Sequence, residues 1–239
     1  MSDALAGRRI VLSAGPTYED IDPVRFIGNR SSGKMGFAIA AAAVRRGARV
    51  VLVAGPVQLA TPAGVERIDV RSAAQMHAAV MAALPADIYI GAAAVADFAP
   101  RAVAEDKIKK PVEGPHADVR ALASDSHRLT DDGLTLELVR TRDILADVAA
   151  HAWRPRLVVG FAAETHDVGR YARDKLQRKR VDMIAANRVG IEGSGFECDD
   201  NTLAVYWPGG ERALGPASKQ QVADGLLGLV ADRFAALPA

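Results

Sequence analysis

Short apolar runs alternate with helical runs along most of this chain. Arg9–Ala14 and Arg49–Ala54 are segments of strand length that are mostly apolar after their first residue, and residues 33–46 between them form an alanine-rich run of helical length. Buried parallel strands have this apolar pattern, whereas a longer alanine-rich run favours a helix. The first 54 residues therefore predict a strand–helix–strand unit.

The same order repeats further along the chain. A capping-box pattern begins at Ser72, with Gln75 three residues later, and predicts the start of a helix. Further strands are expected at residues 67–70, 87–93, 134–139, 157–161 and 182–186, and further helices at residues 143–151 and 168–180. This alternation predicts an α/β fold, with a doubly wound, Rossmann-like and mostly parallel sheet that has helices on both faces.

Ligands bind such sheets beyond the carboxyl ends of the strands. The segments in which we look for chemistry therefore follow Ala14, Ala54, Ala93, Val139, Phe161 and Ala186.

The end of the chain has a different pattern. Residues 202–207 alternate like an edge strand, residues 208–211 form a turn, and residues 217–234 form a long amphipathic helix. Residues 111–132 are polar and lack a clear period, which is typical of a mobile loop. We expect one domain over residues 1–239, with a small appended lobe and a mobile arm around residues 98–132.

Composition places the chain among globular proteins and narrows its partners. It has 239 residues, 49% hydrophobic and 25% charged, and a net charge of +1. A net charge this close to zero gives no strong positive potential for binding nucleic acid. No apolar run reaches the roughly 18 residues that a membrane span needs. We expect a cytoplasmic protein with neither nucleic-acid nor membrane partners. The single cysteine, Cys198, excludes an intrachain disulfide and is expected to be a packing or loop residue.

Residues 28–34 match part of a phosphate-binding P-loop, G-x-x-x-x-G-K. Met35 follows, however, and its thioether cannot replace the hydroxyl that holds magnesium in a P-loop. Ser31, Ser32 and Gly33 could still present backbone N–H groups to a phosphate at the start of the Lys34 helix. An ordinary capped helix explains this segment equally well.

A second candidate site follows the strand at residues 87–93. The small residues Gly91, Ala92, Ala93 and Ala94 could let a flat base lie against the backbone, and Asp97 could hold a ribose hydroxyl or an exocyclic amine. Taken alone, a small-residue packing strip with Asp97 as a cap is the stronger explanation.

Two groups of cations follow. Lys107, Lys109 and Lys110 lie close together, and Lys175, Arg178 and Lys179 have the i, i+3, i+4 spacing that places charges on one helical face. Most such groups are solvated surface. Here, both are expected at the same edge of the sheet as the other candidate segments, which favours a triphosphate site.

Several of these segments together resemble the synthetase half of bacterial phosphopantothenoylcysteine synthetase/decarboxylase. The resemblance rests on residues 14–17, 21–36, 92–97, 107–110, 160–165 and 185–187, and it extends over almost the whole chain. Many bacterial members carry a flavin-dependent decarboxylase domain in front of this half. We find none here and expect no flavin, so the chain is either a stand-alone form or one half of a longer protein.

The resemblance implies a phosphopantothenate–cysteine ligase of coenzyme A biosynthesis. In this reaction 4′-phosphopantothenate reacts with CTP to give an acyl-cytidylate and pyrophosphate, and L-cysteine then displaces CMP to form an amide. Magnesium is expected to be held mainly by triphosphate oxygens, with protein ligands unknown, and the protein is expected to form a homodimer with composite sites.

The resemblance also implies roles for individual residues. Asn29 and Arg25 would lie at the acyl group, Lys107 would reach the reacting phosphates, and the helix start at Ser31, Ser32, Gly33 and Lys34 would bind phosphate. The nucleotide would be bound by Gly91, Ala92, Ala93, Asp97, Lys107, Arg142, Asp143, Ile144, Leu145, Phe161, Lys175 and Lys179.

Two other classes of function remain open at this point. A nicotinamide-dependent oxidoreductase would normally carry G-x-G-x-x-G after the first strand and an acidic residue after the second, and both are absent. A non-catalytic nucleotide sensor would need residues 91–97 but not the Lys107 segment.

Overall fold

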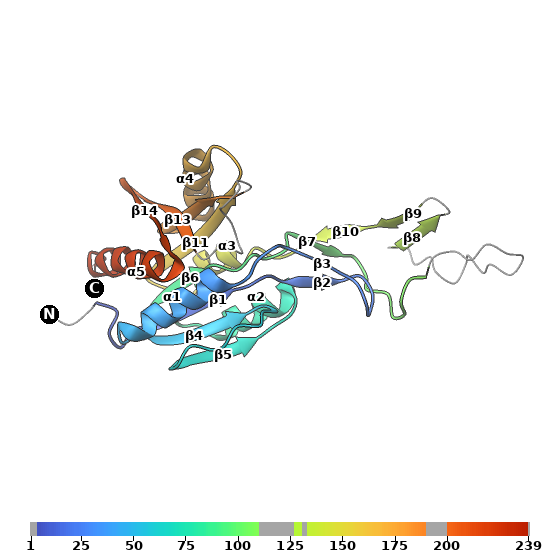
Figure 1. Cartoon of the computed structure of the whole chain (residues 1–239), viewed down its shortest axis with the longest axis horizontal. Coiled ribbons are helices and arrows are strands. Elements are labelled where there is room, and N and C mark those ends of the chain that lie inside the picture. The colour runs from blue at the N-terminus through green and yellow to red at the C-terminus, as the bar shows by residue number, and fades with distance from the viewer. Residues whose placement is uncertain (1–3, 110–126, 131–132, 190–199, 239) are drawn as a thin grey trace, which may run out of the picture.

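The computed structural model describes residues 4–109, 127–130, 133–189 and 200–238 (Figure 1). Within this part of the chain, an eight-stranded sheet has the order β14-β13-β12-β11-β6-β1-β4-β5. Its strands are β1 (Arg9–Ala14), β4 (Arg49–Ala54), β5 (Val65–Asp69), β6 (Ile88–Gly91), β11 (Leu157–Glu164), β12 (Met183–Arg188), β13 (Asp200–Trp207) and β14 (Gly210–Ser218). All neighbours from β12 to β5 are parallel, while β13 and β14 pair antiparallel.

Helices cover both faces of this sheet. α1 (Lys34–Arg45) and α5 (Lys219–Ala235) pack on one face, and α2 (Ala73–Ala82), α3 (Ile144–Ala149) and α4 (Val168–Lys179) pack on the other. The side-chain alternation of a strand explains the division, since Ile10 and Leu12 of β1 join the first core and Val11 joins the second. The predicted doubly wound α/β fold is confirmed.

Local sequence signals define the starts of two helices. Ser72 and Gln75 form the predicted capping box of α2, and Ser218 and Gln221 form a second capping box at α5. None of the described helices is long and apolar enough to cross a bilayer.

Glycine allows α1 to lie close to the sheet. A Cβ added to Gly36 would lie 2.4 Å from the Cβ of Ala14 in β1. Any larger residue at position 36 would therefore push the start of the helix away from the carboxyl end of β1.

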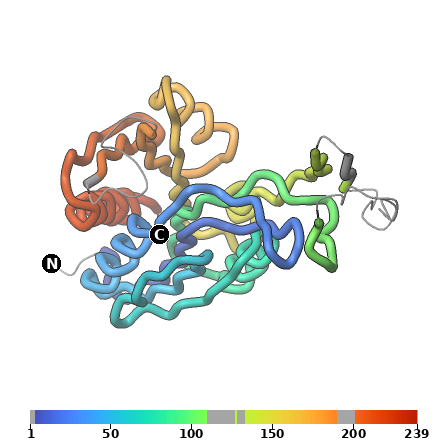
Figure 2. The backbone as a smooth tube through the Cα atoms, turned by 45° about the vertical axis from the view of Figure 1, so that its right-hand side comes forward, coloured from blue at the N-terminus to red at the C-terminus, as the bar shows by residue number. Residues whose placement is uncertain are grey.

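An arm of small antiparallel sheets projects from the carboxyl-end side of the main sheet (Figures 1 and 2). It contains β2 (Tyr18–Asp20) with β3 (Phe26–Gly28), β7 (Phe98–Pro100) with β10 (Leu138–Arg140), and β8 (His127–Thr130) with β9 (Gly133–Leu136). The expected main-sheet strand at residues 134–139 is wrong. Those residues form β9 and the start of β10, and their exposed side chains do not fit a strand buried on both faces.

The expected edge strand at residues 202–207 is also corrected. β13 lies between β12 and β14, and β14, which the sequence pattern missed, forms the edge. The turn at residues 208 and 209 joins the two strands as expected. Cys198 and most of residues 111–132 lie outside the described residues.

Candidate functional site

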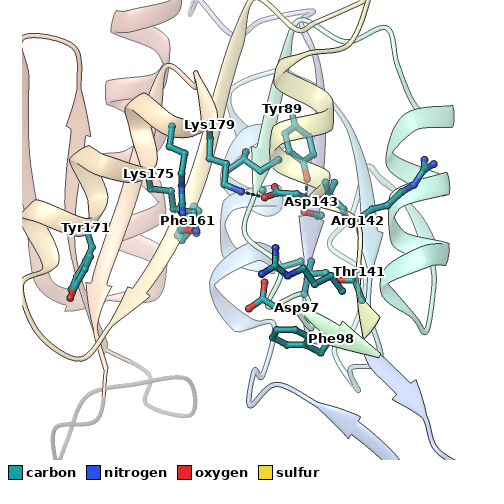
Figure 3. A pocket seen from close by; sticks show the side chains of 18 of the residues that line it. Tyr89, Asp97, Phe98, Thr141, Arg142, Asp143, Phe161, Tyr171, Lys175 and Lys179 are labelled. Carbon is teal, nitrogen blue, oxygen red and sulfur yellow. Dashed lines mark hydrogen bonds and ion pairs between the residues drawn. The ribbon is translucent and has the colours of Figure 1, made fainter. Parts of the chain in front are cut away.

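Two adjoining cavities open at the carboxyl ends of β6 and β11. The larger one, about 1020 Å³, lies between the loop after β6, residues 140–145 and helix α4 (Figure 3). It brings together all the residues expected at the nucleotide except Ala92 and Lys107. These are Gly91, Ala93, Asp97, Arg142, Asp143, Ile144, Leu145, Phe161, Lys175 and Lys179.

The smaller cavity, about 420 Å³, lies at the start of α1. Ala92 is in its wall, as are Asn29 and the expected phosphate-binding residues Ser31, Ser32, Gly33 and Lys34. The two cavities share Ala93, Val95, Asp97, Phe161 and Lys175. A ligand that occupied both would therefore pass over the end of β6, with Asp97 and Lys175 beside the junction.

The loop between the cavities is held by the segments on either side. The backbone of Ala94 pairs with Gly15 and Thr17, and the Thr17 hydroxyl accepts a hydrogen bond from Ala96 N at 2.9 Å. On the other side, the Thr141 hydroxyl donates to the Ala96 carbonyl at 2.6 Å. Small side chains thus line a loop whose backbone is fixed before any ligand binds, as a site that recognises a flat base requires.

Lys175 is the most perturbed cation of the site. Its ammonium donates to the Phe161 carbonyl at 2.7 Å. Burial lowers the pKa of Lys175, while the nearby carboxylates of Glu164 and Asp97 oppose that shift. A triphosphate that entered the cavity would stabilise the charged form of this lysine.

Lys179 lies one turn further along α4 and forms an ion pair with Asp143 across the larger cavity (Figure 3). Asp143 is the N-cap of α3 and accepts a hydrogen bond from Ala146 N at 3.0 Å. Figure 3 also shows the Arg142 side chain directed away from Asp97 and Lys179. Contact between the Arg142 guanidinium and a ligand in this cavity would need another side-chain rotamer.

Tyr89 and Ser13 form a polar floor that sequence reasoning missed. Their hydroxyl oxygens are 3.0 Å apart, and both residues line the larger cavity. Burial raises the pKa of Tyr89 to about 12, so this phenol stays neutral and can donate or accept a hydrogen bond. The signal available in the sequence was a single hydroxyl residue within the apolar part of each of two strands.

No side-chain oxygen caps helix α1. Gly33 is its N-cap residue, with φ of 72°, a left-handed conformation that glycine adopts without strain. A glycine N-cap is compatible with both explanations of this segment, an ordinary capped helix and a phosphate site. The N-terminal end of α1, with its partial positive charge, faces the smaller cavity.

Asn29 precedes this helix and is tied to the loop between the cavities. Its side-chain amide donates to the Val95 carbonyl at 2.9 Å. Asn29 is thus held at the wall of the smaller cavity by the donor end of its side chain.

Arg25 and Lys107 line neither of these two cavities. Arg25 donates to the buried Asp22 carboxylate and, at 2.6 Å, to the Ile108 carbonyl, while Ile108 N donates to Asp22 at 3.1 Å. The hydrogen bond from Arg25, helped by three backbone donors, holds the pKa of Asp22 well below its usual range. The hairpin of β2 and β3 thereby fixes the backbone next to Lys107 and leaves Lys107 itself exposed.

Within the described part of the chain, no three His, Cys, Asp or Glu side chains are grouped so as to hold a metal ion. The larger cavity does contain scattered carboxylates, at Asp97, Asp143, Glu164 and Asp174. Such a set fits a cation that arrives on phosphate oxygens and gains few protein ligands.

Comparison with known proteins identifies the family of this chain. Residues 5–234 match the family model described as the DNA/pantothenate metabolism flavoprotein C-terminal domain. The chain is 48% identical over 231 residues to the Coenzyme A biosynthesis bifunctional protein CoaBC of Vibrio cholerae, an alignment that covers 96% of this chain and 54% of that protein. Its identity to the Escherichia coli K12 protein of the same name is 46% over 226 residues, covering 94% and 52%.

A solved structure shows which half is matched. The crystal structure of the C-terminal domain of Coenzyme A biosynthesis bifunctional protein CoaBC aligns with a TM-score of 0.76 and 36% identity, over 98% of this chain and 99% of that one. The chain thus spans about half the length of its bifunctional relatives and nearly all of their C-terminal domain. It belongs to the DNA/pantothenate metabolism flavoprotein C-terminal domain family, the family of the synthetase half to which its sequence motifs are similar.

Proposed function

We propose that this chain is a CTP-dependent phosphopantothenate–cysteine ligase of coenzyme A biosynthesis. The observation that carries the proposal is the pair of cavities that share Ala93, Asp97 and Lys175. One cavity has a fixed loop for a base and a row of cations for phosphates, and the other has the open start of α1. A reaction that joins a nucleotide to a phosphorylated acid needs two such sites side by side.

The larger cavity would bind CTP. Small side chains at Gly91 and Ala93 leave the loop backbone accessible to the edge of a pyrimidine. Lys175, Arg178 and Lys179 all line this cavity from α4, so the three cations with one-face spacing meet the space for a triphosphate. Lys179 would exchange its ion pair with Asp143 for a phosphate oxygen.

The smaller cavity would bind 4′-phosphopantothenate, with its phosphate at the start of α1 and its carboxylate toward the shared residues. That carboxylate would attack the α-phosphorus of CTP, forming the acyl-cytidylate as the bond to pyrophosphate breaks. The amine of L-cysteine would then attack the acyl carbon, and CMP would leave. Charge develops on phosphoryl and acyl oxygens in these steps, so cations and N–H donors can accelerate them without a covalent protein nucleophile.

Lys107 would act in the cavity of a second subunit. It is exposed on an arm whose apolar side chains are also exposed, by 45% at Phe26, 48% at Phe98 and 42% at Leu138. Exposed apolar residues gathered on a projecting arm favour association with another protein surface. A homodimer formed through this arm would cover them and could carry Lys107 to the partner's nucleotide.

Magnesium would enter with the triphosphate and neutralise part of its charge. The relatives of about twice this length are named bifunctional, which supports a flavin-dependent decarboxylase domain in a longer form of this protein. As a coenzyme A synthesis enzyme, it would work in the cytoplasm on small-molecule substrates.

Turnover with defined substrates tests the proposal. The protein is incubated with Mg²⁺, 4′-phosphopantothenate, L-cysteine and either CTP or ATP, and both pyrophosphate and the amide product are measured. We expect amide formation with a much higher kcat/KM for CTP than for ATP. Equal or better use of ATP would contradict the assignment of the base, and no amide with either nucleotide would overturn the ligase assignment.

One substitution links this result to the larger cavity. Ala93→Leu would fill the space beside the loop and should raise the KM for CTP without unfolding the protein. Arg45→Leu, at the far end of α1, is a control that should leave the KM for CTP unchanged.

A further inference from the structure

The smaller cavity also contains a buried lysine that the proposed nucleotide site does not use. Lys219 lines this cavity and has only 8% of its surface exposed. It comes from the first residue of α5, and Asn201 and Leu203 of β13 lie in the same cavity wall. This wall and the start of α1 therefore come from opposite ends of the chain.

The stability of α5 does not explain a lysine at this position. A helix begins with a partial positive charge and favours acidic residues in its first turn, yet α5 has none there and starts with Lys219. The capping box of Ser218 and Gln221 already stabilises the helix start. Burial of an ammonium group adds a desolvation cost, which an anion bound in the cavity would offset.

The charges that line the smaller cavity supply a reason. Among the described residues that line it, the cations are Arg30, Lys34, Lys175 and Lys219, and the acidic residue is Asp97. Lys175 and Asp97 belong to the junction with the larger cavity. Of the described residues, the remainder of the wall therefore carries Arg30, Lys34 and Lys219 and no acidic side chain, and it adjoins the N-terminal end of α1.

This combination suits a compact dianion. A phosphate monoester has several acceptor oxygens and about two negative charges, which backbone N–H groups at a helix start and a lysine in the same cavity can bind together. A carboxylate or a hydroxyl in the same place would offset less of the positive charge.

We propose that Lys219 is a specificity-determining residue that binds the phosphate of the acid substrate, so that the enzyme selects the phosphorylated acid over its unphosphorylated form. The inference rests on the proposed ligase function and goes further, because it assigns to one residue the discrimination between 4′-phosphopantothenate and pantothenate. Removal of the Lys219 charge should affect the phosphorylated acid alone.

The test compares Lys219→Met and Lys219→Arg with Arg45→Met as the matched control. Arg45 also lies where α1 meets α5, in an exposed ion pair with Asp224 at 2.8 Å, but it is outside both cavities. For each protein we would measure kcat/KM with 4′-phosphopantothenate and with pantothenate, the KM for CTP, and the melting temperature.

We expect Lys219→Met to lower kcat/KM for 4′-phosphopantothenate on the order of 10- to 100-fold, the range for loss of one charged hydrogen bond. The value for pantothenate and the KM for CTP should stay the same, Lys219→Arg should recover part of the loss, and Arg45→Met should behave as the wild type.

An equal loss with both acids would show a structural role, and a raised KM for CTP alone would place Lys219 at the nucleotide. Either result overturns the inference while the ligase function stands. Equal use of both acids by the wild type would also overturn it.

If the wild type made no amide at all, the ligase proposal would fail first. Calorimetric binding of 4′-phosphopantothenate to the wild type and the variants would then test Lys219 without turnover. Lys219→Gln replaces Lys219→Met in every measurement should the methionine variant not fold.

Discussion

At the scale of single residues, Asn29 in the smaller cavity and Lys175 at the junction of the two cavities act through donor groups and charge more than through packing. Asn29 is exposed and donates its side-chain amide to the Val95 carbonyl. Lys175 is buried enough for its pKa to fall, yet it lines both cavities. Substitutions at these two residues should therefore change the reaction more than the stability of the fold.

For Asn29, the informative change is to aspartate. A carboxylate cannot donate to Val95, and it would repel the oxyanion that forms when cysteine attacks the acyl-cytidylate. We expect Asn29→Asp to fold and to release pyrophosphate, but to form amide roughly a hundredfold more slowly and to accumulate acyl-cytidylate. Rapid-quench mass spectrometry detects the intermediate directly. Asn29→Ala, which loses the donor without adding charge, should show a smaller defect, and near-normal amide formation by Asn29→Asp would leave Asn29 with a structural role only.

For Lys175, the prediction concerns pH. The pKa of Lys175 in the ligand-free protein is lowered from its usual 10.5. At pH values between the lowered pKa and 10.5, the Lys175 side chain of the folded protein is therefore mostly deprotonated. The unfolded chain still binds the proton in that window, so the contribution of Lys175 to the free energy of unfolding increases as pH rises. A bound triphosphate would favour the charged lysine, so CTP binding should take up a proton there and weaken as pH rises.

Calorimetry in buffers of different ionisation enthalpy measures this proton uptake. The Lys175→Arg variant stays charged and should bind CTP with a flatter pH dependence, whereas Lys175→Met should bind weakly at every pH. An unchanged slope in Lys175→Arg would assign the pH dependence to another group.

At the scale of elements, the site depends on how closely α1 lies to β1. The start of α1 faces the smaller cavity, and Gly36 sets its distance from the sheet because there is no room for a Cβ beside Ala14. The positions of helix and cavity are therefore linked through a single glycine.

Two glycine-to-alanine substitutions in helices should have opposite effects. Gly36→Ala must displace α1 or β1 and should lower the free energy of unfolding by about 1–3 kcal/mol. Gly228 in α5 has no neighbour closer than an Arg46 nitrogen at 3.6 Å, so Gly228→Ala should gain stability, up to about 1 kcal/mol, from the better helix propensity of alanine. Chemical denaturation measures both values. A stabilised Gly36→Ala would mean that the helix start can move freely.

At the scale of the whole molecule, the arm decides whether the site is complete in one subunit. Asp22 and Arg25 hold the backbone at Ile108 and so fix the segment that carries Lys107, but Lys107 lies in neither cavity of its own chain. A dimer with composite sites predicts that two inactive variants can restore each other.

Lys107→Ala should reduce the rate of acyl-cytidylate formation by roughly a hundredfold, since one contact with a developing phosphate charge is worth about 3 kcal/mol. Lys175→Met should be inactive because it removes a cation from the cavity that binds the nucleotide. After the two are unfolded together and refolded, half of the dimers are mixed and each has one intact site. About a quarter of wild-type activity should return. No recovery from a mixture that light scattering shows to be dimeric would place Lys107 and the cavity of one chain in the same site.

The sequence alone determined the order of most elements and the segments that carry the site. Apolar runs defined β1 and β4, a capping box defined the start of α2, and the segments after β6 and β11 line the cavities as expected. These features depend on side-chain periodicity and backbone chemistry within a few residues, so they can be predicted from local sequence.

The tertiary structure alone decided which distant groups meet. The pattern of residues 134–139 suits a strand in the main sheet as well as a strand in the arm. Their pairing with β7 and β8 places them in the arm. Residues far apart in the chain meet in the Tyr89–Ser13 pair, in the hydrogen bond from Arg25 to Ile108, and in the cavity that Lys219 shares with the start of α1. No local pattern contains these contacts, because strand order and helix packing, which minimise exposed apolar surface over the whole domain, determine which side chains line one cavity.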